Sequence, residues 1–163
     1  MPIRLLVLAA GLVAGPTAAQ IDVTRRGTIF PGPYEAEVVR VVDGDTLEVN
    51  VALWPGLRAE YAVRVRGIDA PELHRPACRE EAELALQAHD QAERLYPPCT
   101  AVQLREVSYD AFAGRVVAEV RRWRTDRWLS FARGMTERDL AAPWEPHQSA
   151  FTWCPPPAAG GAD

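Results

Sequence analysis

The sequence predicts a single domain of the α+β class that is mainly β. Five stretches alternate apolar and polar residues with the period of two that a half-buried strand requires. Between the third and the fourth of them, one stretch changes to helical spacing. The chain has 163 residues, which supports one domain with its own core. This order is compatible with a five-stranded OB-type barrel with flanking helices, although periodicity alone leaves other small α+β folds open.

The composition is typical of a soluble globular protein, with 48% hydrophobic and 25% charged residues. The formal net charge of -4 gives no general sign of a nucleic-acid binder. All 18 basic residues are arginines, whose guanidinium group can bind phosphate in bidentate geometry. Any phosphate site is therefore expected to be a local arginine cluster.

Residues 1–19 have the pattern of a secretory signal peptide. Arg4 precedes an apolar run over Leu5–Val13, and three small residues precede Gln20. The run is too short to span a bilayer, and no cysteine lies at the cleavage site. We expect a mature chain that begins at or near Gln20, is periplasmic or secreted, and has no membrane attachment. Cleavage changes the net charge from -4 to -5, and export permits disulfides.

The remaining chain divides into three parts. Residues 20–33 are expected to form an exposed leader, because Pro31-Gly32-Pro33 disfavours regular structure. The folded domain is expected over 34–144 and an irregular tail over 145–163. An Asp-Gly turn joins the first two predicted strands, and a wider Trp-Pro-Gly loop precedes the third. The predicted strands are Glu35–Val42, Thr46–Leu53, Tyr61–Ile68, Ala101–Val107 and Arg115–Trp123.

Two helices are predicted. The first covers Arg79–Leu95, where apolar residues recur on one face and two prolines follow the last turn. Its early acids, Glu80, Glu81 and Glu83, are interpreted as partners of the helix dipole rather than as ligands. The second helix is predicted over Ser130–Asp139, although it contains a glycine.

Charged residues gather in VRVRGIDAPE, residues 63–72. Strand alternation places two valines on one face and Arg64 and Arg66 on the other. Pro71 then restricts the loop that carries Asp69 and Glu72. Taken alone, such acids are also ordinary turn residues. The DGDT turn at residues 43–46 adds further carboxylates and favours a functional interpretation.

Three motifs occur in a fixed order: VVDGDT, then VRVRGIDAPE, then AGRVVAEV at residues 113–120. Together they resemble the staphylococcal nuclease (thermonuclease) family, over about Glu35 to Trp144. The resemblance selects the five-stranded OB barrel among the open folds. It implies a calcium-dependent enzyme that hydrolyses phosphodiester bonds in DNA and/or RNA, which we expect to be a monomer.

The resemblance also implies roles for individual residues. Calcium is expected on Asp45, Asp69 and the backbone carbonyl of Ala70, because calcium takes hard oxygen ligands; magnesium or manganese remain alternatives. Glu72 is expected to orient or deprotonate the attacking water. Arg64 and Arg115 are expected to bind the phosphate and to stabilise its added negative charge.

Substrate contacts are less well defined. Where relatives carry a tyrosine, this chain has Phe112, which can stack on a base but cannot donate a hydrogen bond to phosphate. Tyr109 is an alternative substrate contact, or an ordinary structural tyrosine. Arg66 has no assigned role and is expected to be solvated or salt-bridged. Trp123 and Trp128 flank a predicted turn and are expected to cover the barrel end rather than form a stacking platform.

The three cysteines form no recognisable zinc pattern with the histidines. Cys78 and Cys99 bracket a helix about 25 Å long, whereas bridged Cα atoms lie about 5 to 6 Å apart, so this pair is disfavoured. The partner of Cys154 stays open on that argument. Secreted relatives with one cysteine before this helix and a Trp-Cys ending imply a bond between Cys78 and Cys154.

Two other classes of protein remain open. A noncatalytic OB module that binds nucleic acid or a peptide has no need for the whole predicted catalytic set. An envelope structural protein would have no affinity for nucleic acid. The sequence does not distinguish DNA from RNA, or internal cleavage from cleavage at an end.

Overall fold

The structure is a computed structural model that describes residues 27–112 and 114–156. The predicted signal peptide, residues 1–19, lies outside the described residues. No described helix is both long enough and apolar enough to cross a membrane. The helices are α1 (Arg79–Leu95) and α2 (Phe131–Thr136). The strands are β1 (Ile29–Phe30), β2 (Tyr34–Val41), β3 (Thr46–Trp54), β4 (Leu57–Val65), β5 (Ile68–Asp69), β6 (Ala101–Tyr109), β7 (Arg115–Arg124), β8 (Arg127–Ser130) and β9 (Ala142–Pro143).

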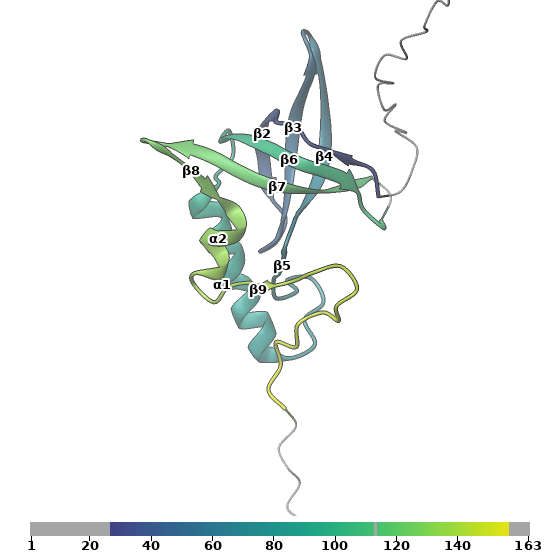
Figure 1. The fold of residues 1–163 in the computed structure, drawn as a ribbon. Helices are drawn as coiled ribbons and strands as arrows, with labels where there is room; N and C mark the ends of the chain where they lie inside the picture. The colour runs from purple at the N-terminus through teal and green to yellow at the C-terminus, as the bar shows by residue number, and fades with distance from the viewer. Residues whose placement is uncertain (1–26, 113, 157–163) are drawn as a thin grey trace, which may run out of the picture.

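Five strands close into a barrel (Figure 1). The order β6-β2-β3-β4-β7 is closed by pairing of β6 with β7, and only β4 and β7 run parallel. The predicted mainly β, α+β fold with a five-stranded OB-like barrel is therefore confirmed. α1 follows the third barrel strand, as its place in the sequence predicts, and lies beside α2 at one end of the barrel.

The core fills the barrel and continues under the helices. Alternate residues of β3 and β4, such as Leu47, Val49 and Val63, are fully buried because the period of two turns them inward. The helices add Tyr96 and Phe131, whose rings pack 4.9 Å apart between centroids. Burial of this apolar surface stabilises the barrel and fixes its strand register.

The two helices differ in how well their bounds are predicted. α1 has the predicted bounds, and Cys78 caps its first turn by accepting a bond from the Glu81 N–H. The second helix is shorter than predicted, because Ser130 is its N-cap and the chain leaves the helix after Thr136. A Cβ at Gly134 would lie 2.9 Å from Leu95, so this glycine lets the two helices pack closely.

Several predicted loops contain strands. Ile29–Phe30, placed in the exposed leader by the sequence, pair with β6, because β2 pairs with only part of that longer strand. The predicted wide loop before the third strand is a two-residue turn, in which Gly56 has a φ of 83° and Trp54 pairs with Leu57. Past the second helix, β9 pairs with β5 and brings the tail against the loop after β4.

Candidate active site

The DGDT turn between β2 and β3 is held by its own backbone. The N–H groups of Val42 and Asp43 both point at the carbonyl of Thr46, and the Asp43 carboxylate accepts a bond from the Asp45 N–H at 3.0 Å. This side-chain bond closes the turn locally, which is the usual role of aspartate in turns. The turn leaves Asp45 only 2% exposed, at the head of β3.

Gly44 lets this turn lie close to the loop after β4. A Cβ at Gly44 would lie 2.8 Å from the Cβ atoms of both Ala70 and Ala88. Since real Cβ atoms almost never approach so closely, any other residue would push the turn away from the loop and from α1. The glycine therefore allows the two acidic motifs to meet.

Arg64 joins the two motifs. From β4, its Nη1 lies 2.8 Å from Asp45 Oδ1 and its Nη2 lies 2.8 Å from Asp69 Oδ1. Asp69 lies at the end of β5, and Gly67, with a φ of 83°, permits the bend that turns it back toward β4. Three of the four side chains that the sequence assigns to metal and phosphate binding are thus joined through Arg64.

The remaining oxygens of these carboxylates also have partners. Asp45 Oδ2 accepts a bond from the Ala70 N–H at 2.9 Å, and Asp45 Oδ1 accepts a second bond from the Thr46 hydroxyl. Asp69 Oδ2 accepts a bond from the backbone N–H of Phe151 at 2.9 Å. The tail therefore takes part in the site, a contact that the sequence analysis did not predict.

The cluster is electrostatically unusual. Burial raises the pKa of Asp45 to about 7, against the opposing effect of Arg64, and the Asp43 carboxylate adds to the rise. Burial also lowers the pKa of Arg64, but Asp45 and Asp69 outweigh it and hold that pKa above its usual value. With all side chains ionised, Asp43, Asp45, Asp69 and Arg64 carry a net charge of about -2.

The donor set fits a hard divalent cation. Asp45, Asp69 and the Ala70 carbonyl supply oxygen atoms only, as calcium and magnesium prefer. One divalent cation would balance the net charge of the cluster. Each carboxylate oxygen has two lone pairs. Asp45 Oδ1 uses both, for Arg64 and Thr46, but Asp45 Oδ2 and the two Asp69 oxygens accept one bond each and keep a lone pair. The residues present therefore suit the predicted metal.

Glu72 lies apart from this contact. It is exposed, and its carboxylate accepts a bond from the His74 N–H at 3.2 Å. Its backbone is held by Glu81, which accepts bonds from the N–H groups of Glu72 and Ala77 at 3.2 and 2.6 Å. The interpretation of Glu81 as a helix-dipole partner is therefore incomplete. This buried glutamate braces the loop that carries Glu72. In the sequence it is one of three acids in the first turns of the helix, so its position there is the only indication of this role.

Arg115 shares a sheet face with Arg64. β4 and β7 pair in parallel, with Ala62 opposite Arg115 and Arg64 opposite Val117. Two residues along one strand and one strand across place the Cα atoms of Arg64 and Arg115 roughly 8 Å apart. Arg115 pairs with Asp110 rather than with the acidic cluster, and that pairing holds the pKa of Asp110 below its usual value despite partial burial.

The two predicted substrate contacts lie differently. Phe112 is 68% exposed, and the Arg115 guanidinium lies 4.9 Å from its ring centroid. Tyr109 pairs with Val116, so it lies on the opposite face of the sheet from Arg115, and its ring contacts Phe30. The structure therefore brings Phe112 to Arg115 but not Tyr109.

Arg66 is only partly solvated, and it forms no ion pair within the described residues, so the expectation of a solvated or salt-bridged side chain is incomplete. Its Nη2 donates to the carbonyls of Glu106 and Val117 and to Ser108 Oγ. Glu106 has a φ of 49° and lies where the register of β6 against β7 shifts. Arg66 thus satisfies carbonyls that this bulge removes from the ladder, which an alternating sequence pattern cannot reveal.

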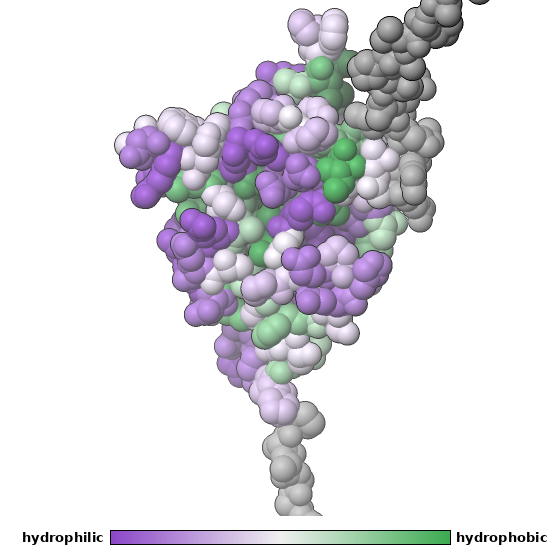
Figure 2. All heavy atoms as spheres, in the orientation of Figure 1, coloured by the Kyte–Doolittle hydropathy of each residue, from purple (hydrophilic) through white to green (hydrophobic). Residues whose placement is uncertain are grey.

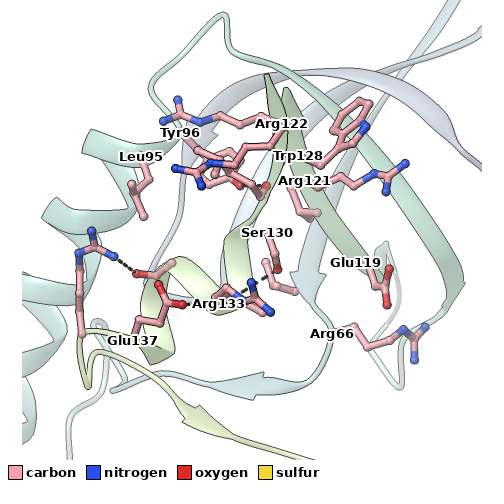
Figure 3. A pocket seen from close by; sticks show the side chains of 17 residues that line it. Arg66, Leu95, Tyr96, Glu119, Arg121, Arg122, Trp128, Ser130, Arg133 and Glu137 are labelled. Carbon is pink, nitrogen blue, oxygen red and sulfur yellow. Dashed lines mark hydrogen bonds and ion pairs between the residues drawn. The ribbon is translucent and has the colours of Figure 1, made fainter. Parts of the chain in front are cut away.

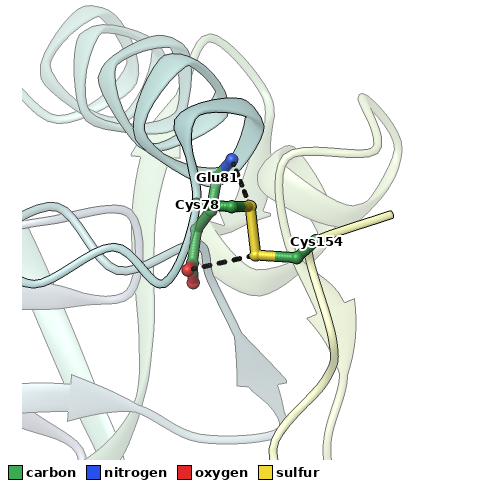
Figure 4. A group of neighbouring side chains, drawn as sticks. All are labelled: Cys78, Glu81 and Cys154. Atoms are coloured by element: carbon green, nitrogen blue, oxygen red, sulfur yellow. Dashed lines mark hydrogen bonds between the residues drawn. A yellow bond between two sulfur atoms is a disulfide. The ribbon is translucent and has the colours of Figure 1, made fainter. Parts of the chain in front are cut away.

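A disulfide fixes the tail beside the loop that carries Glu72 (Figure 4). Cys78 and Cys154 are bonded with Cα atoms 5.9 Å apart, the pair that the resemblance implies, and Cys99 is a free, exposed cysteine. Glu81 lies within reach of both sulfurs. Because the sulfurs are bonded to each other, this group offers no thiolate pair for a metal.

The chain was compared with known proteins. No protein-family model matches it, and no curated protein matches it. The resemblance therefore depends on the three motifs, and the geometry above is independent of it.

Proposed function

We propose that the protein is a secreted, calcium-dependent nuclease that hydrolyses phosphodiester bonds in DNA and/or RNA. The observation that carries the proposal is the contact of Arg64 with both Asp45 and Asp69 at the meeting point of two motifs. This arrangement, a carboxylate pair that can bind a cation and a guanidinium in contact with it, is suited to hydrolysis of a phosphodiester. That reaction needs both positive charge and an activated water.

The arginines bind the phosphate in this proposal. Arg64 and Arg115 project from one sheet face, roughly 8 Å apart, so a phosphate between them can accept from both. Arg115 is already oriented by Asp110, which fixes the plane of its guanidinium. As the water oxygen bonds to phosphorus and the bond to the leaving sugar oxygen breaks, both arginines stabilise the added negative charge.

Asp45, Asp69 and the Ala70 carbonyl would hold the calcium. When bound, calcium supplies positive charge that polarises the phosphoryl group. Glu72 is the general base that takes the proton of the attacking water, and Glu81 positions its backbone through the loop. The exposure of Glu72 leaves its carboxylate free to turn toward a bound substrate.

The disulfide supports the export part of the proposal. Such bonds persist in oxidising compartments and are rare in the cytosol. The mass of the protein recovered from periplasm or medium tests it. We expect a chain that begins at or near Gln20, and a retained Met1 would contradict export.

The decisive experiment measures hydrolysis of denatured DNA with calcium and then with chelator. We expect activity only with calcium, and Glu72→Gln should lower the rate by about 10² to 10⁴ while binding is retained. Glu80→Gln, which changes an exposed acid at the start of α1, is the matched control and should be active. Full activity in Glu72→Gln would overturn the mechanism. Binding without hydrolysis in the wild type would favour the noncatalytic module.

A further inference from the structure

A basic surface lies away from the acidic cluster of Asp43, Asp45 and Asp69. β4 pairs with β7 only as far as Ala118, and β8 joins the same edge of β7 only from Arg121 onward. Between these two pairings a cavity of ≈ 620 Å³ opens toward α2 (Figure 3). Its volume is within the range of about 300–1,000 Å³ that is usual for ligand sites.

Arginines dominate the walls of this cavity. They come from the residue after β4, from β7, β8 and α2, and from the C-terminal flank of α2. Two glutamates, Glu119 and Glu137, also line the cavity. The lining is therefore strongly positive in a chain whose formal net charge is -4. Figure 2 shows hydrophilic side chains over the same region of the surface. We call this cavity the arginine groove, and its arginines are Arg66, Arg121, Arg122, Arg127, Arg133 and Arg138.

Most of this charge is not neutralised within the protein. Among the described residues, Arg121, Arg122 and Arg127 form no ion pair with a carboxylate, and Arg133 lies 3.9 Å from Glu137. The buried Nε atoms of Arg66 and Arg122 have no hydrogen-bond acceptor in the described part of the chain. Because a buried donor is costly when unpaired, the groove favours a ligand rich in acceptor oxygens.

Two tryptophans extend the groove along the β7–β8 hairpin. Trp123 and Trp128 are directly opposite each other, so they share one face, and they are 56% and 39% exposed. The Arg121 guanidinium lies 4.3 Å from the Trp128 ring centroid. The two rings pack edge to face with centroids 5.3 Å apart, which agrees with the predicted packing at the barrel end, and they keep part of their surface exposed. Arg121 also donates from Nε and Nη2 to Gln103 Oε1, a neutral acceptor that leaves its charge in place. Exposed rings beside arginines whose charge is not neutralised can stack with bases while the arginines bind phosphates.

The groove is in line with the candidate active site. Alternation along β7 places Arg115, Arg121 and Trp123 on one face. The six residue steps from Arg115 to Arg121 span about 20 Å, which equals roughly six nucleotides at the 3.4 Å rise of a stacked strand. One strand could therefore reach from the acidic cluster to the groove.

We infer that the arginine groove binds single-stranded nucleic acid beyond the hydrolytic site, with phosphates on its arginines and a base on Trp128. A single strand is favoured over a duplex because only unpaired bases expose their faces for stacking. The inference rests on the proposed function for the identity of the strand. It makes the groove the part of the protein that holds long substrates.

Fluorescence anisotropy of a labelled 12-nucleotide single strand, in chelator, tests the inference without hydrolysis. Trp128→Ala should weaken binding by about 5- to 150-fold, the worth of one stacked base, with an unchanged salt dependence. Arg121→Gln, on the same face as Trp128, should lower the slope of log K against log salt by about 0.7, the value for one lost phosphate contact with a single strand. Arg79→Gln, on the exposed start of α1, is the matched control and should bind like the wild type.

The outcomes separate the groove from the proposed function. Unchanged affinity and salt slope in both groove variants, or an equal loss in Arg79→Gln, would overturn the inference. Duplex bound as tightly as single strand would also overturn it. A wild type that binds through the groove but never hydrolyses in calcium would leave the inference standing and overturn the nuclease. Circular dichroism and urea unfolding identify any variant whose loss comes from misfolding.

Discussion

The bond between Cys78 and Cys154 should account for a large part of the protein's stability. It closes a loop with a sequence separation of 76. The loop-closure relation gives about 4.5 kcal/mol for a loop of this length at 25 °C, and measured losses on removal are typically 2–5 kcal/mol. The best perturbation is the pair Cys78→Ser and Cys154→Ala. Serine keeps an acceptor at the N-cap of α1, so the variant removes the cross-link with little loss of capping.

Urea unfolding, followed by tryptophan fluorescence, measures the effect. With a slope of about 2 kcal/mol per molar urea, a loss of about 4 kcal/mol lowers the midpoint by roughly 2 M. The same shift should follow when a reductant is added to the wild type. Cys99→Ser is the matched control, because this cysteine is exposed and free, and it should change stability by no more than about 0.5 kcal/mol.

A double variant that unfolds within about 1 kcal/mol of the wild type would refute this reasoning. It would mean that the unfolded chain is already restricted, or that the tail contributes little to the fold. Cleavage by chymotrypsin tests the second explanation separately, because the tail carries Phe151 and Trp153. Since the cross-link fixes the segment whose N–H binds Asp69, its loss should speed cleavage there.

Three further predictions concern single side chains. In the metal-free protein, the raised pKa of Asp45 means that the folded state binds a proton more tightly than the unfolded state. Stability from this group is therefore complete below about pH 4 and falls by up to about 4 kcal/mol as the pH rises through about 7; urea unfolding of Asp45→Asn should lack this decline. Glu81→Gln should destabilise the fold by about 1–3 kcal/mol and lower the hydrolysis rate, because its amide can accept only one of the two loop N–H bonds; equal stability and rate would refute its bracing role. Arg66→Lys should cost about 1–2 kcal/mol in urea unfolding, because an ammonium on a different stem cannot reproduce the donation to two carbonyls and a hydroxyl, and a silent substitution would restore the solvated interpretation.

Local periodicity was sufficient for the barrel strands and α1, because these elements bury one face and their sequences repeat with the matching period. The choice of a barrel among small α+β folds came from the resemblance of the three motifs. It was not sufficient for the two-residue strands. Ile29–Phe30 and Ala142–Pro143 are strands only because β6 and β5 offer them an unpaired edge. No local property of two residues encodes that pairing, so neither segment was predicted to be a strand.

The candidate site likewise has one part that the sequence indicates and one part that it does not. The motifs identify Asp45, Arg64 and Asp69 as charged residues near turns, and the structure puts them in contact because Thr46 pairs with Arg64 across β3 and β4. That register is encoded by the apolar alternation on the other face. The contact of the tail with Asp69 depends instead on chain returning from 82 residues away, which no motif describes.

The direct contact of Arg64 with both carboxylates bears on how the proposed site would work. Without a cation, the buried charge of Asp45 is offset mainly by this arginine, which helps the fold to tolerate an ionised acid with so little solvent. A divalent cation on the same oxygens would take over that role and weaken the hold of the carboxylates on the guanidinium. Arg64 would then be available to phosphate only when the cation is present. A single ion pair could thus link metal binding to substrate binding, and phosphate affinity should rise with calcium in the wild type but much less in Arg64→Lys.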